Sequence, residues 1–240
     1  THCISSAASD VYKRQVYPDL VVALAMVKQA SARANREIGV LDPERADLID
    51  RAAQRVIDGE FHDQFTVGVI QGGAGTSTNM NANEVITNIA LELAGREKGD
   101  YAFLSPIDHT NRSQSTNDVY PTAVKIGLSL TLRSLLEELD LLRISFLHKS
   151  HEFHDVLKVG RTQLQDAVPM TLGQEFHGFA STLGYDHTRL TENASLMFEI
   201  NMGATAIGTG ITTHSDYAPA VLKHCLLYTS DAADDMQCVD

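Results

Sequence analysis

The sequence predicts a mainly α-helical fold in which long helices form a bundle, preceded by a smaller helical domain. The first observation is a pair of long segments in which apolar residues recur at spacings of three and four, as on one face of a helix. One segment contains Val124, Leu128, Leu132, Leu135, Leu139, Leu142 and Phe146, and the other contains Leu172, Phe176, Phe179, Leu183, Leu190, Ala194 and Met197. The second observation is that two helices of this length need further helices to cover them. The bundle within these 240 residues is therefore expected to be incomplete.

Three shorter helices are predicted before the two long ones, at residues 20–38, 43–58 and 84–95. Asp42 followed by Pro43 is typical of a helix start, because the carboxylate caps free N–H groups and proline fits the first turn. Residues 64–71, with the sequence QFTVGVIQ, favour a short β-strand, and residues 99–111 are expected to form a connecting loop.

Three polar stretches precede helical segments: GGAGTSTNMNANEVI from Gly72, SQSTNDVYPT from Ser113 and GRTQLQDAVPMTLGQE from Gly160. Each is interpreted as a polar loop that enters a helix, and Thr171 with Gln174 fits a capping box. Any one of them is also typical of an ordinary turn or cap. Together, backbone N–H groups and neutral hydroxyls at positive helix ends favour anion binding, so carboxylates are the expected ligands.

These three stretches, and the block NMGATAIGTGI from Asn201, closely resemble the signature segments of the aspartase/fumarase superfamily. The resemblance covers residues 17–224, and the sequence of these segments is most similar to that of the aspartases. It implies an aspartase/fumarase-type long-helix bundle, with an N-terminal helical domain over residues 17–114 and a partial central bundle over residues 115–224. Residues 1–16 and 225–240 do not match the superfamily, and we expect them to be tails that make few contacts with the core.

The resemblance implies reversible elimination of ammonia from L-aspartate to give fumarate. Removal of the proton beside one carboxylate creates a doubly charged enediolate, so the reaction depends on preorganised hydrogen-bond donors. The residues implied to bind substrate are Thr76, Ser115, Thr116, Asn117, Thr162 and Gln163. The first four would hold one carboxylate and the amino group, and Thr162 would hold the other carboxylate.

No catalytic base is nominated within this chain. The superfamily removes the proton with a serine on a flexible loop of pattern GSSxMPxKxN, and the 240 residues contain no such stretch. The chain is therefore expected to be a fragment of a longer enzyme and inactive by itself. The resemblance further implies a homotetramer whose sites combine segments from different subunits. It implies no cofactor, although a divalent cation activates some relatives.

Gln163 discriminates between the reactions of the superfamily. Fumarases and many relatives carry histidine there, where an imidazole can protonate an oxygen leaving group, and glutamine cannot do so. Ammonia leaves without such help, so Gln163 favours ammonia elimination. The alternatives are a class II fumarase or another lyase of the superfamily, and a non-catalytic structural or interaction protein on the same scaffold.

Other polar patterns are expected to be structural. His148, His151 and His154 share a helical spacing, but no further ligand motif completes a metal site, so none is predicted. Arg161 and Asp166 are expected to lock the third stretch through hydrogen bonds. The glycines of MGATAIGTG lack the strand-turn-helix context of a dinucleotide site and are interpreted as a close-packed turn.

Composition excludes several classes of protein. A content of 43% hydrophobic and 21% charged residues is that of an ordinary globular protein, and no run of about 18 apolar residues predicts a membrane span. A net charge of -12 without basic clusters argues against nucleic-acid binding. The three cysteines, Cys3, Cys225 and Cys238, form no CxxC pair, and the first residues lack a secretory signal. A reducing, cytoplasmic setting is expected.

Overall fold

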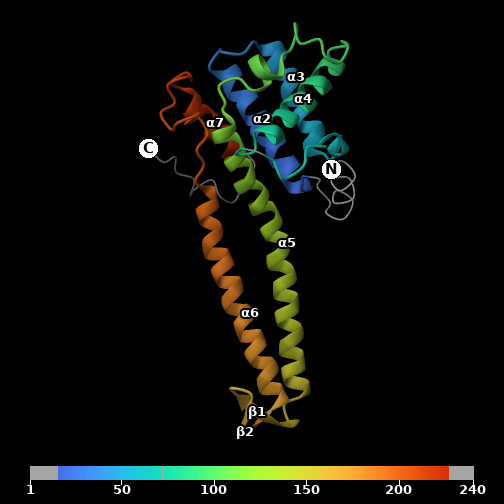
Figure 1. The fold of residues 1–240 in the computed structure, drawn as a ribbon, viewed down its shortest axis with the longest axis vertical. Helices are drawn as coiled ribbons and strands as arrows, with labels where there is room; N and C mark the ends of the chain where they lie inside the picture. Colours follow the sequence, from blue (N-terminus) through green and yellow to red (C-terminus); the bar gives the residue numbers. More distant parts are fainter. Residues whose placement is uncertain (1–15, 72, 227–240) are drawn as a thin grey trace, which may run out of the picture. The chain divides into compact units, whose positions relative to one another are not determined.

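The computed structural model describes residues 16–71 and 73–226 and is mainly helical, as the sequence predicts (Figure 1). The helices are α2 (Pro18–Glu37), α3 (Pro43–Ile57), α4 (Thr76–Leu93), α5 (Thr116–Glu152), α6 (Leu172–Ala194) and α7 (Tyr217–Leu226). The short helices are η1 (His62–Gln64), η2 (Pro106–Thr110) and η3 (Ser195–Phe198), and the strands are β1 (Leu157–Thr162) and β2 (Gln165–Thr171). In the part of the chain described, no helix is both long and apolar enough to cross a membrane.

The chain divides into two compact units, one formed by the described residues up to Leu128 and from Met197 onward, the other by Ser129–Leu196. The division falls inside α5, whereas the sequence suggested a division at Ser115. The reason lies in the first turns of α5, where Val119 and Ala123 are fully buried in the core of the first unit.

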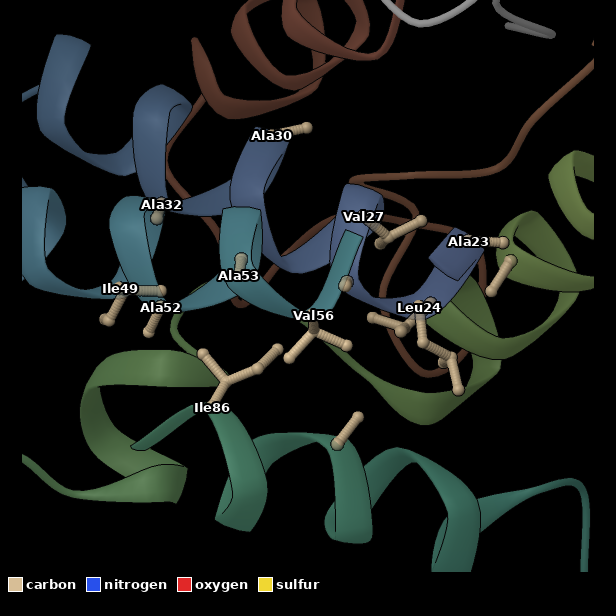
Figure 2. Packing of buried hydrophobic residues seen from close by; sticks show 14 of the residues in the cluster. Ala23, Leu24, Val27, Ala30, Ala32, Ile49, Ala52, Ala53, Val56 and Ile86 are labelled. Atoms are coloured by element: carbon tan, nitrogen blue, oxygen red, sulfur yellow. The ribbon is translucent and has the colours of Figure 1, made fainter. Parts of the chain in front are cut away.

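The core of the first unit forms where α2 packs on α3, α4 and α7. Small side chains are prominent in this core: Ala23 and Ala30 of α2 and Ala52 and Ala53 of α3 are all fully buried (Figure 2). Larger side chains such as Ile86 fill the remaining space between these helices and α4. Close packing of this kind makes the core sensitive to any added volume.

Helix α7 docks on α2 through a buried tyrosine. The Tyr217 hydroxyl donates to Ser31 Oγ at 3.1 Å, and Tyr217 is fully buried. Cys225 near the end of α7 and Val16 before α2 are buried in the same core, so the expectation that the tails make few core contacts is wrong at these two residues. The remainder of the two segments interpreted as tails, residues 1–15 and 227–240, lies outside the described residues.

Most of the polar stretch that starts at Gly72 belongs to helix α4, so the expectation of a loop up to Glu84 is wrong. Helix α4 begins at Thr76, and Asn79 and Asn83 are buried on its inner face, where internal hydrogen bonds replace water. The prediction of a strand at residues 64–71 is also wrong, because this segment follows η1 without pairing and exposes Val69 and Ile70. The expected loop at residues 99–111 contains η2, a single π-helical turn.

The second unit contains the end of α5, the hairpin and α6. A cluster of aromatic rings joins the two helices, with Phe146 lying 5.9 Å from Phe176 and 5.7 Å from Phe179 between ring centroids. Gly173 allows the close approach beside it, since a Cβ there would lie 2.4 Å from the carbonyl oxygen of Ser150. The capping box of Thr171 and Gln174 is confirmed at the start of α6.

Strands β1 and β2 form an antiparallel hairpin that the sequence did not predict. Its two-residue turn consists of Gln163 and Leu164, both with positive φ (50° and 63°). Such turns normally contain glycine or asparagine, so the segment RTQLQ carries no recognisable turn signal. The predicted Arg161–Asp166 pair is confirmed, with Nε donating to Oδ1 at 3.0 Å across the hairpin.

Candidate functional site

The candidate site in the first unit lies where α4 and α5 begin. Gly75 precedes α4 with φ +90°, and a Cβ there would lie 2.4 Å from the Tyr120 ring of α5, so only glycine permits this contact. A hydrogen bond of 2.9 Å from Asn79 Nδ2 to Thr116 Oγ1 joins the same two helix ends. Two helix N-termini, each with a partial positive charge, are thereby brought together.

At the start of α4 the side chain of Gln71 occupies part of the helix end. Its Oε1 accepts the N–H groups of Ser77 at 2.9 Å and Thr78 at 3.3 Å, and its Nε2 donates to the Thr78 hydroxyl at 2.6 Å. Thr76 is exposed beside this cap. The Thr76 hydroxyl is therefore placed at the helix end without belonging to the cap.

At the start of α5 the side chains of Ser115 and Asp118 each accept a backbone N–H group. Ser115 Oγ accepts the N–H of Asn117 at 3.2 Å, and Asp118 Oδ1 accepts the N–H of Ser115 at 2.9 Å. Burial raises the pKa of the Asp118 carboxyl, while backbone N–H donors and the Lys28 charge act in the opposite direction. This arrangement fixes the backbone around Ser115 and Thr116.

Asn117 fastens the start of α5 to the turn at residues 201–206. Its Nδ2 donates to the Ala206 carbonyl at 3.0 Å, and its own carbonyl accepts from Asn201 Nδ2 at 3.0 Å. Asp118 Oδ2 accepts the N–H of Thr205 at 3.1 Å in the same junction. These bonds leave the side-chain oxygen and one N–H of Asn117 for a ligand, and its role in substrate binding remains a prediction.

A buried polar network behind Thr116 was not predicted from the sequence. Lys28 of α2 is fully buried, and its ammonium donates to Asn111 Oδ1 at 3.0 Å and Gln114 Oε1 at 2.8 Å. Burial lowers its pKa to about 7, although the nearby Asp118 carboxylate raises it. The available signal was a lysine within the apolar run LVVALAMVKQA, because buried lysines need partners.

Thr162 and Gln163 belong to the second unit, where they are exposed at the end of β1 and in the hairpin turn. Positive φ is uncommon at a non-glycine residue, so the backbone at Gln163 is strained. This backbone conformation determines the direction in which the Gln163 side chain leaves the turn. The structure brings Ser115, Thr116 and Asn117 together with the start of α4. The grouping of Thr162 and Gln163 with them remains a prediction.

The glycine-rich turn at residues 203–210 packs closely, as expected. A Cβ on Gly203 would lie 2.6 Å from that of Ala218, and one on Gly210 would lie 3.0 Å from the Gly203 carbonyl. A hollow of about 640 Å³ lies over this turn, bordered also by Lys125 and His214. None of the six predicted substrate residues lines it. Within the described residues, no group of His, Cys, Asp or Glu is arranged to hold a metal ion.

The chain belongs to the lyase family, whose model matches residues 5–239. It is 60% identical over 202 residues to the aspartate ammonia-lyase of Pseudomonas aeruginosa, covering 84% of this chain and 43% of that protein. The chain thus spans less than half the length of this relative.

Solved structures of lyases show the same fold. The fumarate lyase:delta crystallin of Brucella melitensis bound to cobalt matches with a TM-score of 0.86 and 49% identity, over 93% of this chain and 48% of that one. The recombinant class II fumarase of Schistosoma mansoni matches with a TM-score of 0.81 and 32% identity, over 93% and 47% respectively.

Proposed function

We propose that the whole protein eliminates ammonia from L-aspartate to give fumarate, reversibly and through an enediolate. The observation that carries the proposal is the junction of α4 and α5, where the hydroxyls of Thr76, Ser115 and Thr116 lie at two helix N-termini held together by Gly75 and Asn79. The 60% identity to an aspartate ammonia-lyase supports the choice of substrate.

The chemistry of this junction suits the difficult step. Removing the proton beside a carboxylate places a second negative charge on that carboxylate, and fixed hydroxyl and N–H donors stabilise it without titrating themselves. Because the donors are fixed by the fold, little reorganisation is needed as charge develops. We assign the base to none of these 240 residues, and Thr162 is proposed to hold the second carboxylate.

Gln163 supports ammonia rather than water as the leaving group. A glutamine amide cannot protonate a departing hydroxide, whereas an ammonium group departs as neutral ammonia. The second candidate is hydration of fumarate, which the likeness to a class II fumarase favours. We further propose that the protein needs no cofactor for this chemistry and works in the cytoplasm as a self-associated enzyme, a homotetramer.

The proposal is tested by expressing the whole protein and measuring ammonia and fumarate formed from L-aspartate, with malate as a parallel substrate and EDTA to remove divalent cations. We expect equal amounts of ammonia and fumarate, and no dependence on added metal. Thr116→Ala should lower kcat roughly a hundredfold to a thousandfold with a smaller change in KM, as for loss of one oxyanion donor.

Thr188→Ala is the matched control, because this exposed hydroxyl donates only within its own helix, to Gly184 O, and should leave kcat unchanged. Turnover of malate alone would establish the fumarase alternative. No turnover of either compound would favour a non-catalytic protein on this scaffold.

A further inference from the structure

A continuous chain of hydrogen bonds runs from Lys28 to the hydroxyl of Thr116. Lys28 Nζ donates to Asn111 Oδ1 at 3.0 Å, and the same oxygen accepts from Asn79 Nδ2 at 3.3 Å and from Asn83 Nδ2 at 3.2 Å. Asn79 Nδ2 also donates to Thr116 Oγ1 at 2.9 Å. Lys28, Asn79 and Asn83 are buried, so water does not compete for these bonds.

Lys28 determines which group donates and which accepts in each of these hydrogen bonds. An ammonium group carries three donors and no acceptor, so the Asn111 atom that faces it must be the carboxamide oxygen. The groups that share this oxygen must then be donors, which orients the NH₂ groups of Asn79 and Asn83 toward it. A deprotonated Lys28 would keep two N–H groups and gain a lone pair, but Asn111 Nδ2 donates to the Gln114 carbonyl at 3.3 Å, which keeps the Asn111 oxygen toward Lys28.

The last link fixes the polarity of Thr116. A carboxamide nitrogen offers two N–H groups, and Asn79 directs one at Asn111 and the other at Thr116 Oγ1. A hydroxyl that accepts this bond keeps its own proton for another partner. A carboxylate only accepts hydrogen bonds, so this is the orientation that a carboxylate requires.

We infer that Asn79 is a positioning residue, which holds the Thr116 hydroxyl as a donor toward the substrate carboxylate. The inference rests on the proposed function, because it takes a carboxylate as the partner of Thr116. The side-chain oxygen of Asn79, like that of Asn83, is buried and finds no partner among the described residues, and such an orphan acceptor weakens a fold. Of the two asparagines, only Asn79 also donates to Thr116. The amide is thus used for its two donors.

A double-mutant cycle in the whole protein tests this inference. Asn79→Asp replaces the donor with acceptor oxygens and turns the Thr116 proton inward, and Asn79→Leu removes the donor at similar size. We expect Asn79→Asp to lower kcat by about a hundredfold, the effect of losing an oxyanion donor, and Asn79→Leu to lower it less. In a Thr116→Val background, which lacks the hydroxyl, either change should cost at most about a further twofold.

Asn81→Asp is the control, because Asn81 lies on the same helix but its side chain bonds to Gln64 and Val67 rather than to Thr116. It should retain kcat within about twofold. Losses at Asn79 that multiply with the loss from Thr116→Val would overturn the inference, since a general packing defect does not depend on the hydroxyl. If Asn79→Asp does not fold, the Asn79→Leu cycle decides alone.

The outcome is separable from that of the proposed function. The cycle is measured with whichever carboxylate the wild-type protein turns over, so a protein that acts on malate alone refutes the aspartate assignment and still tests Asn79. If the protein acts on L-aspartate but the effects of the Asn79 and Thr116 substitutions are additive, the proposed function stands and the inference about Asn79 is refuted.

Discussion

Lys28 shows how one buried cation organises a site that it does not enter. It holds Asn111 and Gln114 from the middle of α2, and these residues belong to the segment that leads into α5. Asn111 in turn anchors Asn79 and Asn83 of α4. A single side chain therefore orients groups on three segments, at the cost of burying its own charge.

Lys28 should make stability depend on pH in an unusual direction. Burial lowers its pKa from 10.5 to about 7, so between these values the unfolded chain holds a proton that the folded chain has released. The free energy of unfolding then rises with pH across this window, by up to about 1.4 kcal/mol per pH unit from this group. Below pH 7 both states are protonated, and the contribution no longer changes.

The measurement is urea unfolding of the wild-type protein and of Lys28→Met at several pH values and one protein concentration. The variant lacks this titrating group. The free energy of unfolding of the wild-type protein, minus that of the variant, should therefore increase as pH is raised from 7 to 10. A difference that stays constant over this range would show that Lys28 remains charged in the folded protein.

At the scale of elements, each of the helices α4, α5 and α6 starts at a side-chain cap. Gln71 caps α4 from the preceding segment, Ser115 and Asp118 cap α5, and Thr171 caps α6. Free N–H groups at a helix start need such partners. Only the last of these caps follows the S/T-x-x-E/Q pattern, which explains why only it was predicted.

Gly75 sets the junction of α4 and α5, and Gly75→Ala should destabilise it. Gly95→Ala is a matched control at the other end of α4: both residues have positive φ (90° and 70°), but a Cβ on Gly95 meets nothing within 4 Å. The backbone cost of about 1 to 2 kcal/mol is therefore common to both. The clash with Tyr120 should add about 1 to 3 kcal/mol at Gly75, measured by urea unfolding. Equal losses for the two variants would contradict the close contact.

At the scale of the whole molecule, the second unit leaves much apolar surface uncovered. Leu135, Leu141 and Leu142 of α5 are each about half exposed, and so is Phe179 of α6. Large apolar side chains exposed to this extent are typical of an interface. It supports the proposed self-association, because further helices are needed to complete the bundle.

Leu135→Glu combined with Leu142→Glu should therefore weaken self-association of the whole protein. Burying two carboxylates without partners is unfavourable, so we expect a clear shift to smaller species in analytical ultracentrifugation. Ser134→Glu is the control, since it adds charge to the same exposed helix without removing apolar surface. A wild-type protein that sediments as a monomer would refute the proposed assembly.

The sequence by itself determined the class of fold, the long helices, and the capped starts of α3 and α6, because apolar spacing and caps are local signals. It did not predict the hairpin, where Gln163 and Leu164 adopt positive φ without a glycine or asparagine to announce it. It also placed the start of α4 at Glu84 rather than Thr76, since threonine and asparagine favour loops unless the fold buries and pairs them.

Only the tertiary structure decided how the site residues are oriented. Thr116 is recognisable in the sequence, but the direction of its hydroxyl depends on Asn79, Asn111 and Lys28, the last more than 80 residues away along the chain. Asn117 is equally recognisable, and the structure uses its amide to hold Ala206. Residue type sets which hydrogen bonds are possible, and only the packing of distant segments decides which are made.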